Sequence, residues 1–176
     1  VEEKNMKIEQ AIQTAIEYEK RVAETYKNAM QEVESAAGKR VFEVLAKEEQ
    51  GHIDYLESRL SEWRETGQLS AEALPTAVPP PEKIDEAARQ LKEKLDQPQS
   101  ASTAEQALLQ KALVAEEETS GFYEKMVAQM EGTERELFAR FLEIERGHLA
   151  IVKAEIDAVT GFGYWFDMPE WRFADG

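Results

Sequence analysis

The sequence predicts an all-α protein in which four long helices form a bundle, with a long connection between the second and third helices. Apolar residues recur at helical spacing in four extended runs. Prolines fall outside these runs, mainly in one segment near the middle of the chain. Apart from an aromatic tail, no segment shows the alternation typical of a strand. We therefore expect helices that bury their apolar stripes against one another.

The first hairpin is predicted from two runs with helical spacing. The first run extends from Asn5 to Ser35 without proline or glycine, and the second follows Gly38. The stripe of the first run is Ile8, Ile12, Ala15, Ile16, Val22, Ala23, Tyr26 and Met30. The stripe of the second run is Val41, Phe42, Leu45, Ile53, Leu56, Leu60 and Trp63.

A proline-rich connection, residues 66–102, separates this hairpin from the second one. A continuous helix cannot contain its prolines, which are Pro75, Pro79, Pro80, Pro81 and Pro98. Within the connection, the segment from Pro81 to Asp96 is predicted to form a short helix. Its apolar side would comprise Ile84, Ala88, Leu91 and Leu95.

The second hairpin begins near Ser102 or Thr103, where Thr103 and Gln106 are spaced as in a capping box. Gly132 and Thr133 separate its two helices. The stripe of its first helix is Leu109, Ala112, Thr119, Tyr123, Met126 and Met130. The stripe of its second helix is Leu137, Phe138, Phe141, Val152, Ile156 and Val159.

These elements predict a single bundle domain over residues 1–160, made of hairpins 5–65 and 103–160 joined by the crossover. Residues 161–176 form a tail rich in aromatic residues, which are Phe162, Tyr164, Trp165, Phe166, Trp171 and Phe173. We expect the tail to pack on its own bundle or on a partner subunit, which favours a homodimer.

The charge balance excludes several classes of function. The chain of 176 residues has a formal net charge of −15, whereas binding to nucleic acid or anionic lipid needs a basic surface. It has no cysteine, so disulfides, thiolate zinc sites and iron–sulfur clusters are excluded. No apolar run approaches the ~18 residues of a membrane span. The first residues lack the features of a secretory signal, and a cytoplasmic location is expected.

The two halves of the chain resemble each other. Glu19 and Tyr26 match Glu116 and Tyr123, 97 residues further on. The second helices match at a separation of 96 residues, where Phe42, Glu49, Gly51 and His52 correspond to Phe138, Glu145, Gly147 and His148. The difference of one residue falls in the hairpin turn, where deletions are tolerated. The pattern indicates an internal duplication of a hairpin.

Six ionisable residues interrupt the apolar stripes near the middle of the four helices: Glu19, Glu49, His52, Glu116, Glu145 and His148. An unpaired buried carboxylate costs several kcal/mol, so a counter-ion is expected. Two histidines cannot neutralise four carboxylates, whereas two divalent cations balance their charge.

The spacing also suits metal ligands. Residues three apart are neighbours on a helix, so each Glu-x-x-His places a carboxylate beside an imidazole. With 30 glutamates in 176 residues, chance places Glu three residues before both histidines in about 3% of such sequences. A Glu from each of two helices and a Glu-x-x-His from each of the others form the ligand set of di-iron and di-manganese bundles. Zinc also accepts these ligand types.

On these motifs the chain resembles the ferritin-like superfamily, and within it the rubrerythrin-like branch. The resemblance covers roughly residues 5–65 and 103–160. It implies a ferritin-like four-helix bundle with two iron ions, manganese or zinc being alternatives. Glu49 and Glu145 would bridge the two metals. The remaining ligands would be terminal, as the pairs Glu19 with His52 and Glu116 with His148.

The resemblance further implies that Tyr26 and Tyr123 orient ligand carboxylates by hydrogen bonds across the site. The alternative for both tyrosines is plain core packing.

Two departures from rubrerythrins qualify the implied activity. This sequence contains no cysteine, whereas those proteins carry an iron–sulfur domain with four cysteines, so electrons are expected to come from an external donor. Thr119 stands on the core face where rubrerythrins carry an additional glutamate, and Glu117 and Glu118 are expected on the surface. A symmetric site of four Glu and two His is therefore expected.

The resemblance implies a di-iron oxidoreductase that oxidises Fe(II) with hydrogen peroxide or dioxygen, as a peroxidase or ferroxidase. Two alternatives stay open: non-catalytic metal handling, such as iron delivery, storage or sensing, and a structural bundle stapled by a metal. Three other glutamates near the ligands, Glu17, Glu24 and Glu48, are expected to be surface charges.

Overall fold

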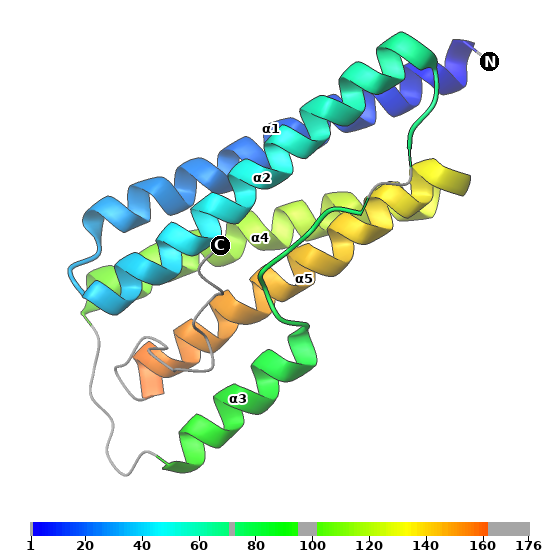
Figure 1. Ribbon diagram of the computed structural model, residues 1–176. Helices are drawn as coiled ribbons and strands as arrows, with labels where there is room; N and C mark the ends of the chain where they lie inside the picture. The colour runs from blue at the N-terminus through cyan, green and yellow to red at the C-terminus, as the bar shows by residue number, and fades with distance from the viewer. Residues whose placement is uncertain (1, 71–72, 95–101, 162–176) are drawn as a thin grey trace.

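A computed structural model describes residues 2–70, 73–94 and 102–161 and contains five helices within them (Figure 1). They are α1 (Glu2–Glu32), α2 (Ala36–Thr66), α3 (Pro81–Lys94), α4 (Thr103–Gln129) and α5 (Gly132–Gly161). These ranges contain no strand, which confirms the all-α prediction. Residues 71–72 and 95–101 of the connection and residues 162–176 of the aromatic tail lie outside the described residues.

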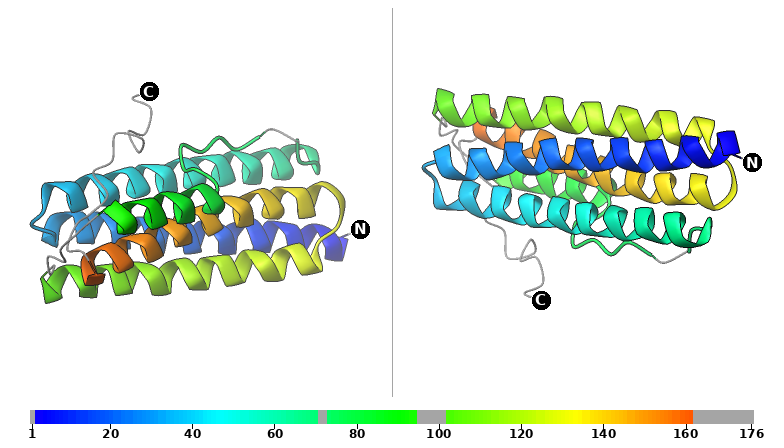
Figure 2. Two further views of the ribbon diagram at one scale, coloured as in Figure 1. Left: turned by 90° about the horizontal axis from the view of Figure 1, so that it is seen from below. Right: turned by 90° about the horizontal axis from the view of Figure 1, so that it is seen from above.

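The four long helices lie side by side (Figures 1 and 2). Helix α1 packs against α2 and α4, and α4 packs against α5, while the short α3 packs on the outside of α5. Helix α2 ends at the opposite end of the molecule from the start of α4 (Figure 2). The connection between them must therefore run the length of the molecule.

The helix boundaries follow from capping groups. Ser35 caps α2, because its hydroxyl accepts a hydrogen bond from the backbone N–H of Gly38 at 3.1 Å. The second helix thus begins at Ala36, slightly before the glycine that was expected to precede it. Gly67 ends α2 in the left-handed conformation, with φ of 69°.

The cap of α4 differs from the predicted one by one residue. Ser102, and not Thr103, occupies the N-cap position, and its hydroxyl accepts a hydrogen bond from Glu105 N–H at 3.2 Å. The capping box predicted from Thr103 and Gln106 is therefore wrong. The carboxylate of Glu105 instead accepts a hydrogen bond from the backbone N–H of Ser35 at 3.3 Å, which joins the start of α4 to the α1–α2 turn.

The core consists of two apolar clusters, one toward each end of the bundle. One is built around Tyr26 and Phe42, and the other around Tyr123, Phe138 and Phe141. Residues 19, 49, 52, 116, 145 and 148 lie along their helices between the stretches that form these two clusters. A polar layer thus separates two apolar halves of the core.

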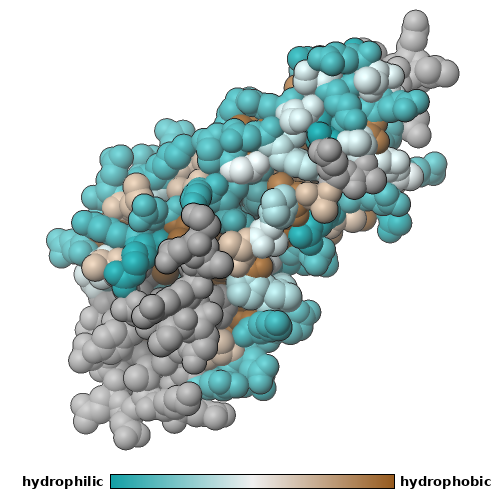
Figure 3. All heavy atoms as spheres, viewed as in Figure 1, coloured by the Kyte–Doolittle hydropathy of each residue, from teal (hydrophilic) through white to brown (hydrophobic). Residues whose placement is uncertain are grey.

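The outer surface in the view of Figure 3 is mainly hydrophilic. No helix of the described segments has the length and apolar character needed to cross a membrane.

Candidate metal centre

All six predicted ligand residues lie in the interior, each with an exposed fraction of 1% or less. Helix α1 contributes Glu19, and α4 contributes Glu116. Helices α2 and α5 contribute one Glu-x-x-His pair each, Glu49 with His52 and Glu145 with His148. One ligand atom from each of these last four side chains lies within 4.8 Å of the others. The buried Glu-His-Glu-His cluster can hold a metal ion.

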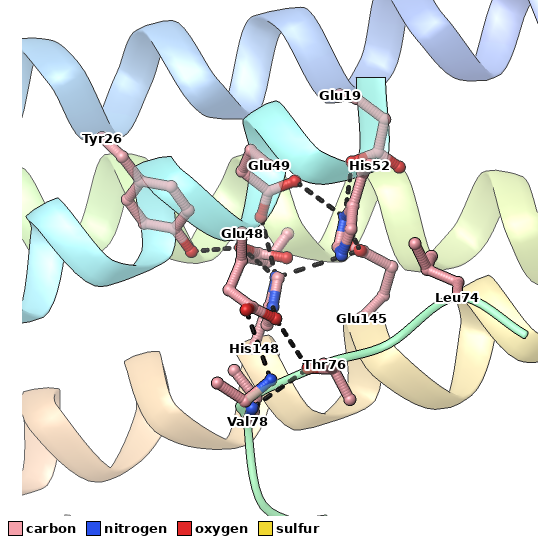
Figure 4. Close-up of polar contacts among 12 residues, drawn as sticks. Glu19, Tyr26, Glu48, Glu49, His52, Leu74, Thr76, Val78, Glu145 and His148 are labelled. Carbon is pink, nitrogen blue, oxygen red and sulfur yellow. Dashed lines mark hydrogen bonds and ion pairs between the residues drawn. The ribbon is translucent and has the colours of Figure 1, made fainter. Parts of the chain in front are cut away.

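Glu49 and Glu145 each approach both histidines (Figure 4). Glu49 places Oε1 2.7 Å from Nδ1 of His148 and Oε2 3.2 Å from Nδ1 of His52. Glu145 Oε1 lies 3.4 Å from Nδ1 of His52 and 3.9 Å from Nδ1 of His148. The two imidazole rings stack with centroids 5.3 Å apart and planes inclined by 7°. Both Nδ1 atoms therefore face the carboxylates at the centre of the layer.

Glu19 and Glu116 lie at opposite ends of this group. Glu19 Oε2 is 3.1 Å from His52 Nδ1, and Glu116 Oε1 is 3.9 Å from His148 Nδ1. Each of these carboxylates also accepts a hydrogen bond from a fully buried tyrosine of the other hairpin. Tyr26 donates to Glu116, and Tyr123 donates to Glu19. The hydroxyls of both tyrosines thus contact site carboxylates, which plain core packing would not require.

Charge and burial shift the ionisation of this cluster strongly. Burial lowers the pKa of both histidines, but the charges of nearby carboxylates, Glu49 foremost, outweigh it and hold the pKa values well above the ordinary range. Burial, reinforced by the charge of Glu145, raises the pKa of Glu116. Burial and the adjacent carboxylates also raise the pKa of Tyr26 and Tyr123, so both phenols stay protonated at neutral pH. The layer therefore attracts cations or protons.

Hydrogen bonds within the described residues do not satisfy this polar layer. Several nitrogen and oxygen atoms of the layer lie close together without the angles that a hydrogen bond requires. Within this layer, the buried atoms without a hydrogen-bond partner are Glu49 Oε1 and Oε2, His52 Nε2, Glu116 Oε2, Glu145 Oε1 and Oε2, and His148 Nδ1 and Nε2. Unsatisfied buried polar groups cost about 1–3 kcal/mol each, and more when charged. Oxygen and imidazole donors converging in this way suit divalent metal ions.

Glu48 was expected on the surface, but it is half-buried and contacts the site. Its carboxylate accepts a hydrogen bond from the Thr76 hydroxyl at 2.6 Å and one from the Ala77 N–H at 3.3 Å. Oε2 also lies 3.9 Å from Nε2 of His148. Burial opposes its charge, but the nearby His148 imidazole and the hydrogen bonds from Thr76 and the Ala77 backbone together lower its pKa to about 2. Glu48 is therefore a charged residue beside the site, missed because periodicity did not place it there.

A comparison of the two halves of the repeat could have singled out Glu48. At the separation of 96 residues Glu48 corresponds to Ile144, so the two halves differ at the position directly before a predicted ligand.

The other surface predictions are confirmed. Glu17, Glu24, Glu117 and Glu118 are exposed. Thr119 is buried on the core face, as its place in the stripe predicted. Its hydroxyl donates a hydrogen bond to the Ala115 carbonyl one turn earlier, at 2.9 Å.

No family model, curated protein or solved structure matches this chain.

Proposed function

We propose that this chain is a di-iron oxidoreductase of rubrerythrin-like type, built on a ferritin-like four-helix bundle. It would oxidise Fe(II) with hydrogen peroxide or dioxygen. The observation that carries this proposal is the buried group of Glu49, His52, Glu145 and His148, flanked by Glu19 and Glu116 at its two ends. Four carboxylates balance the charge of two divalent ions. Together with two imidazoles they form the ligand set of dinuclear carboxylate bundles.

The distances support a division of roles among these ligands. Glu49 and Glu145 approach both histidines, which supports a bridging role for these two carboxylates. Glu19 approaches His52, and Glu116 approaches His148, which supports two terminal pairs. Manganese and zinc accept the same donor types, so the donor set alone does not select iron, and the identity of the metal is proposed as well.

Several residues of the chain would prepare the site for this chemistry. Tyr26 and Tyr123 fix Glu116 and Glu19 by hydrogen bonds from the opposite hairpin. Because the phenols stay protonated, they can go on donating to the terminal carboxylates as the charge of the site changes. The apolar clusters on both sides would exclude bulk water.

Two Fe(II) ions held here would supply the two electrons that, with two protons, reduce hydrogen peroxide to two molecules of water. An external donor would then have to return the electrons, because the chain has no cysteine for an iron–sulfur cluster of its own. The alternative is that the same residues hold a metal without turnover, for delivery, sensing or stapling of the bundle.

Anaerobic loading with Fe(II), followed by one equivalent of hydrogen peroxide, distinguishes these proposals. We expect about two Fe(II) bound per chain and ferric absorption in the near ultraviolet after peroxide. Glu49→Ala and Glu145→Ala should abolish both, whereas the exposed control Glu24→Ala should behave as wild type. Full metal occupancy without oxidation would favour a staple or carrier, and absence of binding would refute the metal centre.

A further inference from the structure

The internal repeat is broken directly beside the candidate metal centre. Glu48 on α2 corresponds to Ile144 on α5, a buried apolar residue. The ligands themselves, Glu49 and Glu145, are matched, but the residue preceding each is charged in one half and apolar in the other. The surroundings of the two histidines are therefore chemically different.

On the His148 side, Glu48 lies between the histidine and the crossover. We call residues 74–78 of the crossover the strap. Glu48 Oε2 accepts the hydrogen bond of the Thr76 hydroxyl at 2.6 Å and lies 3.9 Å from His148 Nε2 (Figure 4). Glu48 Oε1 accepts a hydrogen bond from Ala77 N–H. One carboxylate thus contacts the strap through both of its oxygens and faces the ring nitrogen that points away from the site.

Further contacts hold the strap against α5. The guanidinium of Arg140 donates two hydrogen bonds to the Leu74 carbonyl, at 3.2 and 3.0 Å. The strap also runs close over Gly147, where an added Cβ would lie 3.0 Å from Val78 Cγ1. The matching glycine of the other half, Gly51, has open space at the same position. Of this matched pair of glycines, only Gly147 on α5 is therefore covered by another segment among the described residues.

Among the described residues, no carboxylate corresponds to Glu48 on the His52 side. Like Nε2 of His148, Nε2 of His52 is buried and has no hydrogen-bond partner among the residues described. The ring instead meets Phe141 edge-on, with centroids 5.5 Å apart and planes at 81°. Both histidines face the central carboxylates through Nδ1, but only His148 has a carboxylate near its other nitrogen in the described structure.

We propose that Glu48, by placing its charge between His148 and the strap, makes the two metal positions unequal, so that the first ion binds more tightly at the His148 position. This inference rests on the proposed metal centre. Glu48 Oε2 is 3.9 Å from His148 Nε2, so this contact is a charge interaction and not a hydrogen bond. A carboxylate beside the outer nitrogen of a ligand histidine orients the ring and makes Nδ1 a better ligand, and removing such a partner weakens metal binding about 10–100-fold. Glu48 is a positioning residue, since it acts through His148.

Anaerobic calorimetric titration with Fe(II) alone tests the inequality. We expect wild type to bind two ions in two resolved steps. Glu48→Gln, which keeps the shape of the side chain but removes its charge, should weaken the tighter step about 10–100-fold and leave the weaker step unchanged. Glu24→Gln makes the same charge change at an exposed position and should alter neither step.

A second variant tests the part played by the strap. Thr76→Val removes the hydroxyl that donates a hydrogen bond to Glu48, but it retains Glu48 and His148. We expect faster hydrogen exchange at the Ala77 amide, and a weakening of the tighter step that is smaller than in Glu48→Gln. If Glu48→Gln does not fold, this variant decides the question. Its weakening of the tighter step supports the inference, and two unchanged steps overturn it.

The failure of this inference differs from the failure of the proposed function. Two equal iron sites in wild type, or equal weakening of both steps in Glu48→Gln, would overturn the inequality and leave the metal centre standing. A wild-type chain that binds no Fe(II) would overturn both.

Discussion

Tyr26 on α1 donates a hydrogen bond to Glu116 on α4, and both side chains are fully buried. The two residues belong to different hairpins. The reciprocal bond runs from Tyr123 on α4 to Glu19 on α1. The matching tyrosines of the repeat thus exchange partners, and each hairpin holds a carboxylate of the other. This exchange ties the two halves together at the polar layer.

Tyr26→Phe should therefore destabilise the metal-free protein. The substitution removes a hydroxyl and leaves the carboxylate of Glu116 without this donor, and an unsatisfied buried group costs about 1–3 kcal/mol. Urea denaturation at pH 7 should show a loss of that size in the free energy of unfolding. Tyr18→Phe is the matched control, because the ring of Tyr18 stacks on Phe122 and this contact does not need the hydroxyl. We expect the free energy of unfolding of this variant to equal that of wild type. Equal stability of Tyr26→Phe and wild type would show that the bond contributes nothing.

The two glycines of the repeat should respond differently to alanine. Gly51 lies in a helix with open space around an added Cβ, so Gly51→Ala should stabilise the protein by about 0.5–1 kcal/mol through helix propensity. At Gly147 the new Cβ would lie 3.0 Å from Val78 Cγ1 and 3.4 Å from the Pro79 carbonyl oxygen. Gly147→Ala should lose this gain, and it should also speed hydrogen exchange in the strap. Thermal unfolding of the two variants gives the comparison, and an equal gain at both positions would argue against close coverage by the strap.

Ser102→Ala and Thr103→Ala test the start of α4. The hydroxyl of Ser102 accepts the Glu105 N–H, so its removal should cost about 1 kcal/mol in the free energy of unfolding. Thr103 is the first residue of the helix and is exposed, so Thr103→Ala should change stability by less than about 0.5 kcal/mol. A larger loss for Thr103→Ala in urea denaturation would restore the cap predicted from the sequence.

This cap shows where sequence patterns stop being decisive. Ser102 with Glu105 and Thr103 with Gln106 both have capping-box spacing, one residue apart. The tertiary contact that accompanies the observed choice, from the Ser35 N–H to Glu105, joins residues 70 positions apart. Local spacing carries no information about such a contact.

The long helices and the buried layer were predictable for a simple reason. Helical periodicity places positions 19, 49, 52, 116, 145 and 148 on apolar stripes, and a stripe must face other helices. Glu48 was not predictable in this way, because it stands beside the stripe and is half-buried by contacts with Thr76 and Ala77. Those residues lie in an irregular segment without periodicity. The ligand roles of the six buried residues stay predictions.

The stability of the metal-free protein should fall as pH rises above neutrality. Carboxylates raise the pKa of His52 and His148 above the unfolded value of 6.5. The folded chain therefore binds these protons more strongly than the unfolded chain does. The resulting stabilisation is complete below pH 6.5 and is lost as pH rises through the folded pKa values. Glu116 has the same sign, because its folded pKa is also raised, and its contribution is complete only below 4.5.

Metal should reverse this dependence if the buried layer is a metal centre. A bound divalent ion takes the place of the protons, so binding strengthens as the histidines lose them. At 100 times its dissociation constant an ion adds about 2.7 kcal/mol to the free energy of unfolding.

Thermal unfolding at pH 6 and pH 8.5 should therefore show the metal-free protein less stable at the higher pH. Anaerobic Fe(II) should raise the midpoint more at pH 8.5 than at pH 6. Protein carrying both His52→Gln and His148→Gln is the control, and it should lose most of both trends. An equal metal effect at the two pH values would mean that the ion binds elsewhere, since a site that competes with these protons must strengthen as they leave.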